Sequence, residues 1–331
     1  MVLDHNGGII DSEFERAAKK FSTTYVRKKL NFDDVNIPED NVENNDKIVD
    51  YILSNTTRNA DGRLVMPLIG NNKVKHLLGN NRHLATQILK SNLKKFTIKN
   101  PDFLNMMDQY FKEQQELGVI ERIENLEQFL LENPCHSFMD HLGVFELERE
   151  TTKCRVVFLS NLSGRDPSQK VTLSHNQAML SGPCINQNIT TALLNLHFDT
   201  KLLCFDVKKA FLNNCLTPFD SNKLLLLWFK NMARKDYSLV GYRNLRLPFR
   251  LVCSPFLLLL GLYKILEIDT DMDSKEIKGL KRHIYSLIYM DNGSITSNTA
   301  EELLWAFDNL KNIFKPYKFC LQQFVTNDKE L

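Results

Sequence analysis

The sequence predicts an α+β fold in which an antiparallel sheet carries helices on one face. Two observations predict it. Some segments repeat apolar residues at helical spacing, and others alternate or run apolar in the manner of strands. The two kinds are mixed without the strict strand–helix–strand repeat that a doubly wound parallel sheet requires. Beyond a first helix at Ser12–Phe32, we expect helices at residues 85–96, 103–117, 188–196, 254–268 and 300–314, and strands at 64–68, 144–148, 153–159, 202–207, 224–228, 242–247 and 285–290.

The N-terminal third divides into a peripheral part and a basic helical part. Residues 1–60 are expected to be a linker segment, partly disordered, with a basic amphipathic helix at Ser12–Phe32 and a solvated loop at Asp33–Asp50, which is rich in Asn, Asp and Glu. The tripeptide Asp61-Gly62-Arg63 indicates a turn into the first strand. Residues 61–142 then form a basic helical segment in which Gly118 is expected to end the second helix.

From residue 143 the pattern changes, and residues 143–331 mix expected strands with expected helices. Residues 144–148 alternate like a strand, residues 149–152 are expected to turn, and residues 153–159 return, which predicts a hairpin. In the last expected helix, residues 300–314, the apolar side chains fall on one face. They are Leu303, Leu304, Phe307, Leu310 and Phe314.

Composition limits the class of protein but does not identify it. The net charge is +2, yet residues 62–101 contain no acidic residue. This basic stretch favours contact with a phosphate backbone. The alternative is a basic helical face that pairs with acidic segments elsewhere, such as residues 38–50. The exposed cations that we would assign to nucleic acid are Lys90, Lys94 and Lys95.

Cysteine spacing and hydropathy exclude several classes of protein. None of the seven cysteines forms a Cys-x-x-Cys pair, which argues against a structural zinc site and favours a reducing compartment. The N-terminus lacks the pattern of a signal peptide. The strongest apolar run, Leu251–Leu266, is too short to span a bilayer. We therefore expect no membrane contact and a location in the cytoplasm or within virus-like particles.

Two aspartates stand at the ends of apolar strands. Residues 202–205 run apolar into Asp206, and residues 285–290 run largely apolar into Asp291. A carboxylate in such surroundings is costly unless it is paired or binds a metal. Strand-end carboxylates brought together from distant sequence are what two-metal phosphoryl-transfer sites use. The alternative is that each aspartate only begins a turn.

Segments that include these aspartates resemble the palm motifs of reverse transcriptases. Residues 205–211, Phe-Asp-Val-Lys-Lys-Ala-Phe, resemble the first motif, and residues 288–292, Ile-Tyr-Met-Asp-Asn, resemble the third. Between them, residues 247–256 are similar to the family's Leu-Pro-Phe-Gly-Leu-x-x-Ser-Pro-Phe. Residues 153–158 resemble the fingers strand that carries a nucleotide-contacting arginine.

Further segments resemble one branch, the BEL/Pao-type LTR retrotransposons. Asp61-Gly62-Arg63 with Pro67, followed by Gly-Asn-Asn-Arg at residues 79–82, is similar to the segment that precedes their polymerase. Residues 141–144 resemble their Pro-His-His-Gly-Val, and residues 173–183 resemble their Ser-Leu-Asn-Asp through Gly-Pro. The resemblance covers roughly residues 11–331. It implies that residues 61–142 lead into the fingers and that residues 143–331 are the fingers and palm of an RNA-directed DNA polymerase, truncated after the third palm motif. The chain would be a fragment of a retrotransposon polyprotein.

The resemblance also implies roles for individual residues. Asp206, Asp291, the carbonyl of Val207 and the side chain at Asn292 would hold two Mg²⁺ or Mn²⁺ ions. A further set would bind the deoxynucleoside triphosphate: Lys153, Arg155, Phe211 and Arg250. Among these, Phe211 would exclude a 2′-hydroxyl, and Arg155 would hold the triphosphate in bidentate fashion. The alternatives are a core aromatic for Phe211 and a solvated lysine beside the hairpin turn for Lys153. The reaction would join a primer 3′-hydroxyl to the α-phosphate on an RNA or DNA template–primer, releasing pyrophosphate.

Three positions depart from the family pattern. Asn292 replaces the second aspartate of the third motif, Arg250 replaces a glycine, and Leu159 stands where the fingers motif has an aspartate. These changes favour a weakened or inactive copy. The alternative to an enzyme is therefore a remnant of the same fold that binds nucleic acid without catalysis.

A third interpretation takes residues 290–294, Met-Asp-Asn-Gly-Ser, as an aspartic-protease loop. Such a site needs a second aspartate loop that shares a proton with the first. The sequence has no second copy, although a homodimer could supply one. After residues 319–323, which resemble the strand following the third motif, we expect no room for a thumb, RNase H or integrase, and none upstream for a protease. The remainder of a polyprotein would be a partner.

Overall fold

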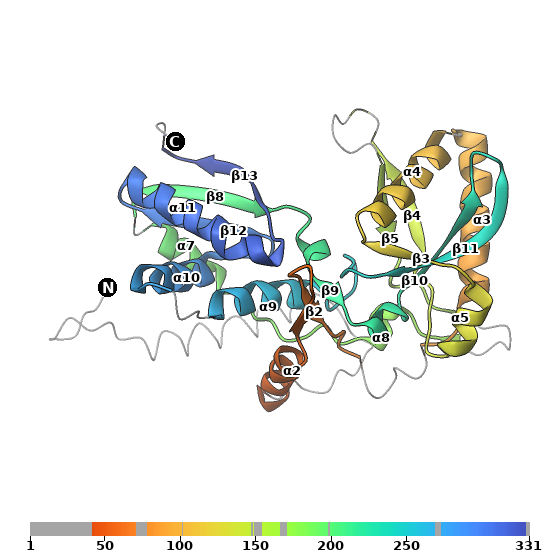
Figure 1. The fold of residues 1–331 in the computed structure, drawn as a ribbon, viewed down its shortest axis with the longest axis horizontal. Helices are drawn as coiled ribbons and strands as arrows, with labels where there is room; N and C mark the ends of the chain where they lie inside the picture. Colours follow the sequence, from red (N-terminus) through yellow and green to blue (C-terminus); the bar gives the residue numbers. More distant parts are fainter. Residues whose placement is uncertain are drawn as a thin grey trace.

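The structure is a computed structural model that describes residues 42–70, 78–100, 102–146, 148, 154–165, 171–197, 199–268 and 273–328. It confirms an α+β fold with small, mainly antiparallel sheets. Figure 1 shows two lobes side by side, joined through the short strands β2 and β9. We name them the Asp206 lobe, built on strands β8, β12 and β13, and the Trp228 lobe, built on strands β3, β10 and β11. The predicted helix at Ser12–Phe32 and the turn at residues 149–152 lie outside the described residues.

The sheet of the Asp206 lobe has the strand order β12-β8-β13, and both pairings are antiparallel. The strands are β8 (Lys201–Val207), β12 (Asn292–Ser297) and β13 (Leu321–Thr326). Alternate residues of β8, namely Leu203, Phe205 and Val207, are buried in the core. The helices of this lobe are α7 (Ile189–Leu196), α9 (Ser254–Glu267), α10 (Lys275–Leu287) and α11 (Ala300–Phe314). The other face of β8, which includes Asp206, stays partly exposed, so this side of the sheet is free to form a site.

The sheet of the Trp228 lobe has the order β10-β11-β3, again antiparallel. Its strands are β3 (Ile120–Ile123), β10 (Leu225–Asn231) and β11 (Asp236–Asn244), and a separate hairpin pairs β4 (His141–Phe145) with β5 (Cys154–Phe158). Three helices complete the lobe: α3 (Arg82–Lys99), α4 (Asp102–Glu116) and α5 (Leu126–Glu132). The rings of Phe111 and Trp228 stack at its centre, with their centroids 4.7 Å apart.

Short elements connect the lobes. Helix α2 (Val42–Ser54) precedes a hairpin of β1 (Thr57–Arg58) and β2 (Leu64–Met66), and β2 pairs in parallel with β9 (Cys215–Leu216). The turn of this hairpin requires a glycine, because Gly62 has φ +94° and a Cβ there would lie 2.3 Å from the Pro316 carbonyl oxygen. The remaining elements are α6 (His175–Ala178), α8 (Pro218–Ser221), β6 (Gly164–Arg165), β7 (Val171–Thr172), η2 (Ala210–Asn213) and η3 (Lys315–Tyr317).

Most predicted elements are confirmed within a few residues. The helix over residues 300–314 has the predicted bounds, and Gly118 ends α4 with φ +61°. The hairpin begins three residues earlier than predicted, at His141. The strand predicted at residues 242–247 is β11, which ends at Asn244.

Two predictions are wrong. The loop predicted at residues 33–50 is helical from Val42 onward, because Ile48 and Ile52, four residues apart, pack against the core of the protein. The strand predicted at residues 285–290 is helical up to Leu287, because Leu280, Ile284 and Leu287 form one buried face of α10. In both segments helical spacing of apolar residues outweighs local composition.

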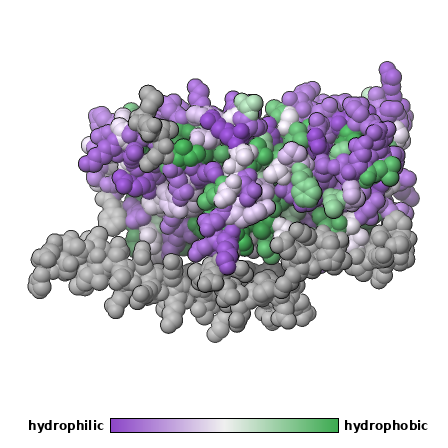
Figure 2. All heavy atoms as spheres, turned by 60° about the horizontal axis from the view of Figure 1, so that its bottom comes forward, coloured by the Kyte–Doolittle hydropathy of each residue, from purple (hydrophilic) through white to green (hydrophobic). Residues whose placement is uncertain are grey.

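The surface in Figure 2 is mainly hydrophilic, with apolar side chains in small groups between the polar ones. The apolar run at residues 251–266 is not part of this surface, because most of it belongs to α9, whose leucines are buried. In the part of the chain that the structure describes, no helix combines the length and the apolar character needed to cross a membrane.

Candidate active site

Asp206 is the last residue on the exposed face of the central strand β8. Its neighbours Phe205 and Val207 point into the core, so the carboxylate between them points to the open side of the sheet. Asp206 lies opposite Asn292 on β12 and opposite Gln322 on β13. The Gln322 amide donates a hydrogen bond of 2.9 Å to Oδ2 of Asp206. The carboxylate is therefore held by an amide side chain from one flanking strand, and Asn292 is its neighbour in register on the other.

Asp291 lies in a tight turn beside the end of β8. Tyr289 and Asn292 exchange backbone hydrogen bonds of 2.9 Å and 3.1 Å, and the turn between them contains only Met290, with φ +60°, and Asp291. The amide of Val207 donates to the Asp291 carbonyl at 2.9 Å. These hydrogen bonds attach the turn to β8, so two aspartates from distant parts of the sequence lie on neighbouring segments at one end of the sheet.

The oxygen atoms at this end of the sheet suit a hard cation. The donors are the carboxylates of Asp206 and Asp291, the carbonyl of Val207 and the amide of Asn292, and oxygen ligands of this kind are those that Mg²⁺ and Mn²⁺ prefer. Asn292 donates its amide hydrogen to Oδ1 of Asp291 at 3.2 Å. Among the described residues, no three His, Cys, Asp or Glu side chains form a metal-binding group. The oxygen donors are thus of the kind that such an ion prefers, but only two of them, the carboxylates of Asp206 and Asp291, carry a negative charge.

The four predicted nucleotide-binding residues have different surroundings. Lys153 lies outside the described residues. Arg155 is exposed on β5, and Arg250 is exposed in the loop before α9. Phe158 of β5 contacts Phe249 with ring centroids 5.3 Å apart, so the structure brings the strand of Arg155 next to the loop of Arg250. Phe211 lies in η2, shortly after β8, and is half-buried against the core.

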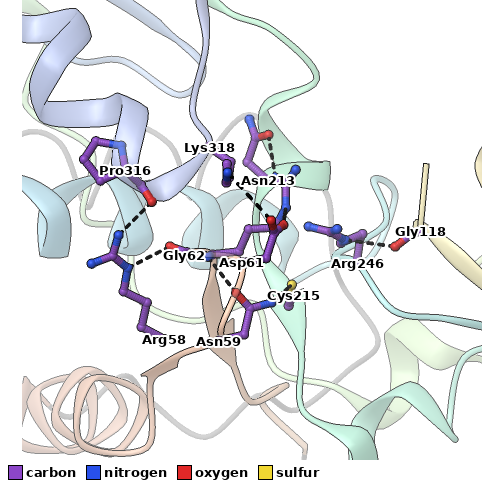
Figure 3. A network of polar contacts seen from close by, with 11 residues as sticks. Arg58, Asn59, Asp61, Gly62, Gly118, Asn213, Cys215, Arg246, Pro316 and Lys318 are labelled. Carbon is purple, nitrogen blue, oxygen red and sulfur yellow. Dashed lines mark hydrogen bonds and ion pairs between the residues drawn. The ribbon is translucent and has the colours of Figure 1, made fainter.

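A network of polar contacts supports the segment that follows Asp206 (Figure 3). Arg63 donates to Oδ1 of Asn213 at 3.3 Å, and the Asn213 amide donates to the carbonyl of Lys208 at 3.1 Å. Nearby, Arg58 donates to the Pro316 carbonyl at 2.7 Å, and Lys318 lies 3.7 Å from Asp61. The turn Asp61-Gly62-Arg63 therefore ties the N-terminal hairpin to the segments that follow β8 and α11.

The predicted nucleic-acid-binding lysines lie far from this site. Lys90, Lys94 and Lys95 are exposed on α3. Figure 1 places α3 at the end of the Trp228 lobe, opposite the Asp206 lobe. Among the described contacts, no ion pair joins these three lysines to Asp46 or Asp50 of the acidic segment 38–50, whose first residues lie outside the described part of the chain. Their contact with a phosphate backbone stays a prediction.

Sequence patterns did not predict the role of Gln322. The residues around it were expected to form a strand, and they do, as β13. Its contact with Asp206 depends on the register between β13 and β8, which includes an irregularity after Gln322. No local signal distinguishes it from the adjacent Gln323. At Leu159, where the family pattern has an aspartate, the side chain is half-buried after β5.

No model of a known protein family matches the sequence, and a search among curated proteins finds no match.

The backbone at Arg250 leads to a prediction about stability. Arg250 has φ +77°, a left-handed conformation that costs a non-glycine residue about 1 kcal/mol. Arg250→Gly is expected to raise the free energy of unfolding by about that amount in urea titrations. Arg250→Ala removes the guanidinium but keeps the Cβ, so it should give no comparable gain. Equal gains in the two variants would contradict backbone strain as the cause.

Proposed function

We propose that this chain is the fingers and palm of an RNA-directed DNA polymerase from a BEL/Pao-type retrotransposon polyprotein. The observation that carries the proposal is the turn at Met290–Asp291, which is hydrogen-bonded to the end of β8 next to Asp206. Asp291 lies in a two-residue turn beside Asp206, near the end of a strand in a three-stranded antiparallel sheet. Such a pair of carboxylates suits the binding of metal ions, which neutralise phosphate charge in phosphoryl transfer. The Trp228 lobe would correspond to the fingers, and the Asp206 lobe to the palm.

The residues at the site divide the chemistry between them. Asp206, Asp291, the Val207 carbonyl and the Asn292 amide would hold two Mg²⁺ or Mn²⁺ ions. When bound, such ions neutralise the charge of the triphosphate and orient the oxygens of an in-line displacement. Gln322 fixes one oxygen of Asp206 through its hydrogen bond and leaves the other oxygen available. Arg155 would hold the triphosphate, and Phe211 would lie beneath the incoming sugar.

A second candidate function, duplex binding without catalysis, is favoured by Asn292. This residue supplies no charge, and its amide is already engaged with Asp291. The site then has two carboxylates, fewer than the family pattern provides. The exposed lysines of α3 would still attract a template–primer.

The experiment that tests the proposal is primer extension on an RNA template with deoxynucleoside triphosphates and Mg²⁺ or Mn²⁺. It compares the unmodified chain, Asn292→Asp, and Asn292→Asp combined with either Asp206→Asn or Asp291→Asn. Restoring the second acid should raise extension about tenfold, and removing either aspartate should then lower it about 100-fold. The matched control is Asp308→Asn, which removes an exposed carboxylate of α11 and should leave extension unchanged.

The outcomes separate the two functions. Extension that depends on Asp206 and Asp291 supports a polymerase. Duplex binding by fluorescence anisotropy, with no extension in any variant, supports the binding remnant. If the chain neither extends a primer nor binds the duplex, both functions are wrong.

A further inference from the structure

A groove with a volume of about 510 Å³ opens on the Asp206 lobe, away from the candidate active site. Helices α10 and α11 form its sides, and the end of β12 forms its base. Ser297, in the groove, is five residues along β12 from Asn292, or roughly 16 Å at the usual rise of a strand. The volume lies in the range of pockets that take a ligand or a few side chains.

The groove is acidic, and no cationic side chain among the described residues compensates its charge. Asp199, Glu276 and Glu302 line it, and its described lining contains no lysine or arginine. Asp199 accepts hydrogen bonds from the Thr296 hydroxyl at 2.6 Å and from the Asn298 amide at 3.0 Å, which are neutral donors. No lysine or arginine among the described residues forms an ion pair with any of the three carboxylates.

His283, the titratable base in the described lining, adds no positive charge at neutral pH. His283 contacts the Thr296 hydroxyl at 3.1 Å, and its burial lowers the pKa of the imidazole, although the nearby Asp199 raises it in part. The imidazole is therefore neutral near pH 7. The groove consequently presents an excess of negative charge to whatever enters it.

The rest of the lining suits an aliphatic chain with a cationic end. Leu280, Ile295 and Ala306 provide an apolar base. Trp305 is 43% exposed at the rim, and an indole ring is the best partner for a cation–π contact. At Gly279 a Cβ would meet nothing within 4 Å, so the groove is open above α10.

We propose that this groove binds a segment of a protein partner that carries arginine or lysine next to an apolar residue. The cation lies between the carboxylates and over Trp305, and the apolar neighbour packs on Leu280 and Ile295. Charge complementarity selects this occupant, because a nucleic-acid phosphate would be repelled by Asp199, Glu276 and Glu302. The groove would hold the partner without obstructing the end of the sheet where Asp206 lies.

The test measures binding of a short fluorescein-labelled peptide, in which arginine and leucine alternate, to the full chain by anisotropy. A matched peptide has glutamine in place of each arginine. The arginine peptide should bind at least about tenfold more tightly, and the double variant Asp199→Asn with Glu302→Gln should remove most of this difference. Peptide binding should also change the fluorescence of Trp305, one of only two tryptophans in the chain.

Gly279→Leu gives an independent test that does not remove charge. A leucine inside α10 favours the helix, so the variant should fold at least as well as the unmodified chain, while its side chain fills the groove and lowers peptide affinity about tenfold or more. Glu301→Gln, on α11 but outside the lining, is the control and should bind normally. Equal binding of the two peptides, unchanged binding by Gly279→Leu, or full competition by an RNA–DNA duplex would overturn the proposal.

Discussion

Trp228→Ala is expected to lower the free energy of unfolding by about 3–5 kcal/mol, the range for removing a large aromatic side chain from a core. Trp228 is 1% exposed in β10 and stacks on Phe111 with an interplanar angle of 9°. Alanine leaves a cavity between the sheet and α4, which the rigid β10–β11 pairing cannot close. Urea unfolding followed by circular dichroism measures the change.

The indole nitrogen of Trp228 also stabilises the fold, through a hydrogen bond that the substitution removes. It donates a hydrogen bond of 3.0 Å to Oδ1 of Asp108, whose other oxygen pairs with Lys112 at 2.7 Å. Trp228→Phe keeps an aromatic ring but leaves Asp108 without this donor, and it should cost about 1–3 kcal/mol. Trp305→Ala is the control, because its side chain is 43% exposed and its loss should change stability by about 0.5 kcal/mol or less. A loss below about 1 kcal/mol for Trp228→Ala would contradict the packing described.

The sequence predicted the long helices α3, α4, α9 and α11, because their apolar residues repeat every three or four positions, but it missed α2 and α10, which have 13 residues each. In helix α11, Leu303, Leu310 and Phe314 are fully buried and Phe307 packs against the core as predicted, whereas Leu304, predicted on the same face, is 45% exposed. Short segments, and segments whose pattern fits both a strand and a helix, were harder to predict. Tyr285 and Leu287 would suit a strand or a helix. Only the burial of Ile284 and Leu280, about one and two turns before Leu287, decides for the helix. Strand β3 and helix α5 were not predicted, because they are too short for a periodic signal.

The candidate site could be predicted in part. The apolar runs placed Asp206 and Asp291 at strand ends. Asp206 does lie near the end of β8, but Asp291 follows helix α10 and lies in the turn before β12, at the same end of the sheet. The contact from Gln322 could not be predicted, because it depends on how two strands align across a bulge. The left-handed backbone at Arg250 could not be predicted either. The sequence shows an arginine where the family pattern has a glycine, and only the φ angle of +77° gives a conformational reason for the glycine.

Asp140→Asn is expected to stabilise the protein by about 4 kcal/mol at pH 8 and by almost nothing near pH 4. Asp140 is 5% exposed, in a small cavity beside His141, and burial raises the pKa of its carboxyl to about 7. A carboxyl whose folded-state pKa is raised costs stability only when it ionises. The cost is therefore absent below the unfolded value of 3.8, grows as the pH rises, and is complete above about 7.

The same variant should make the loss of stability in acid steeper. Burial lowers the pKa of His141 and of His175 to about 4, so both are neutral in the folded protein while the unfolded chain takes up protons below its value of 6.5. Each histidine then removes about 3 kcal/mol as the pH falls from 6.5 to about 4. In the unmodified chain, protonation of Asp140 offsets part of this loss over the same range, and in the variant it does not.

Urea titrations of both proteins between about pH 4 and pH 8 measure the difference directly, because the histidines are common to both and cancel. Asp236→Asn, at an exposed carboxylate whose pKa is lowered by hydrogen bonds from Ser238, is the matched control and should show no gain at high pH. A difference between Asp140→Asn and the unmodified chain that does not vary with pH would mean that the Asp140 carboxyl is solvated in the folded protein. The small cavity between α3 and β4 would then have to admit enough water to keep the carboxylate ionised.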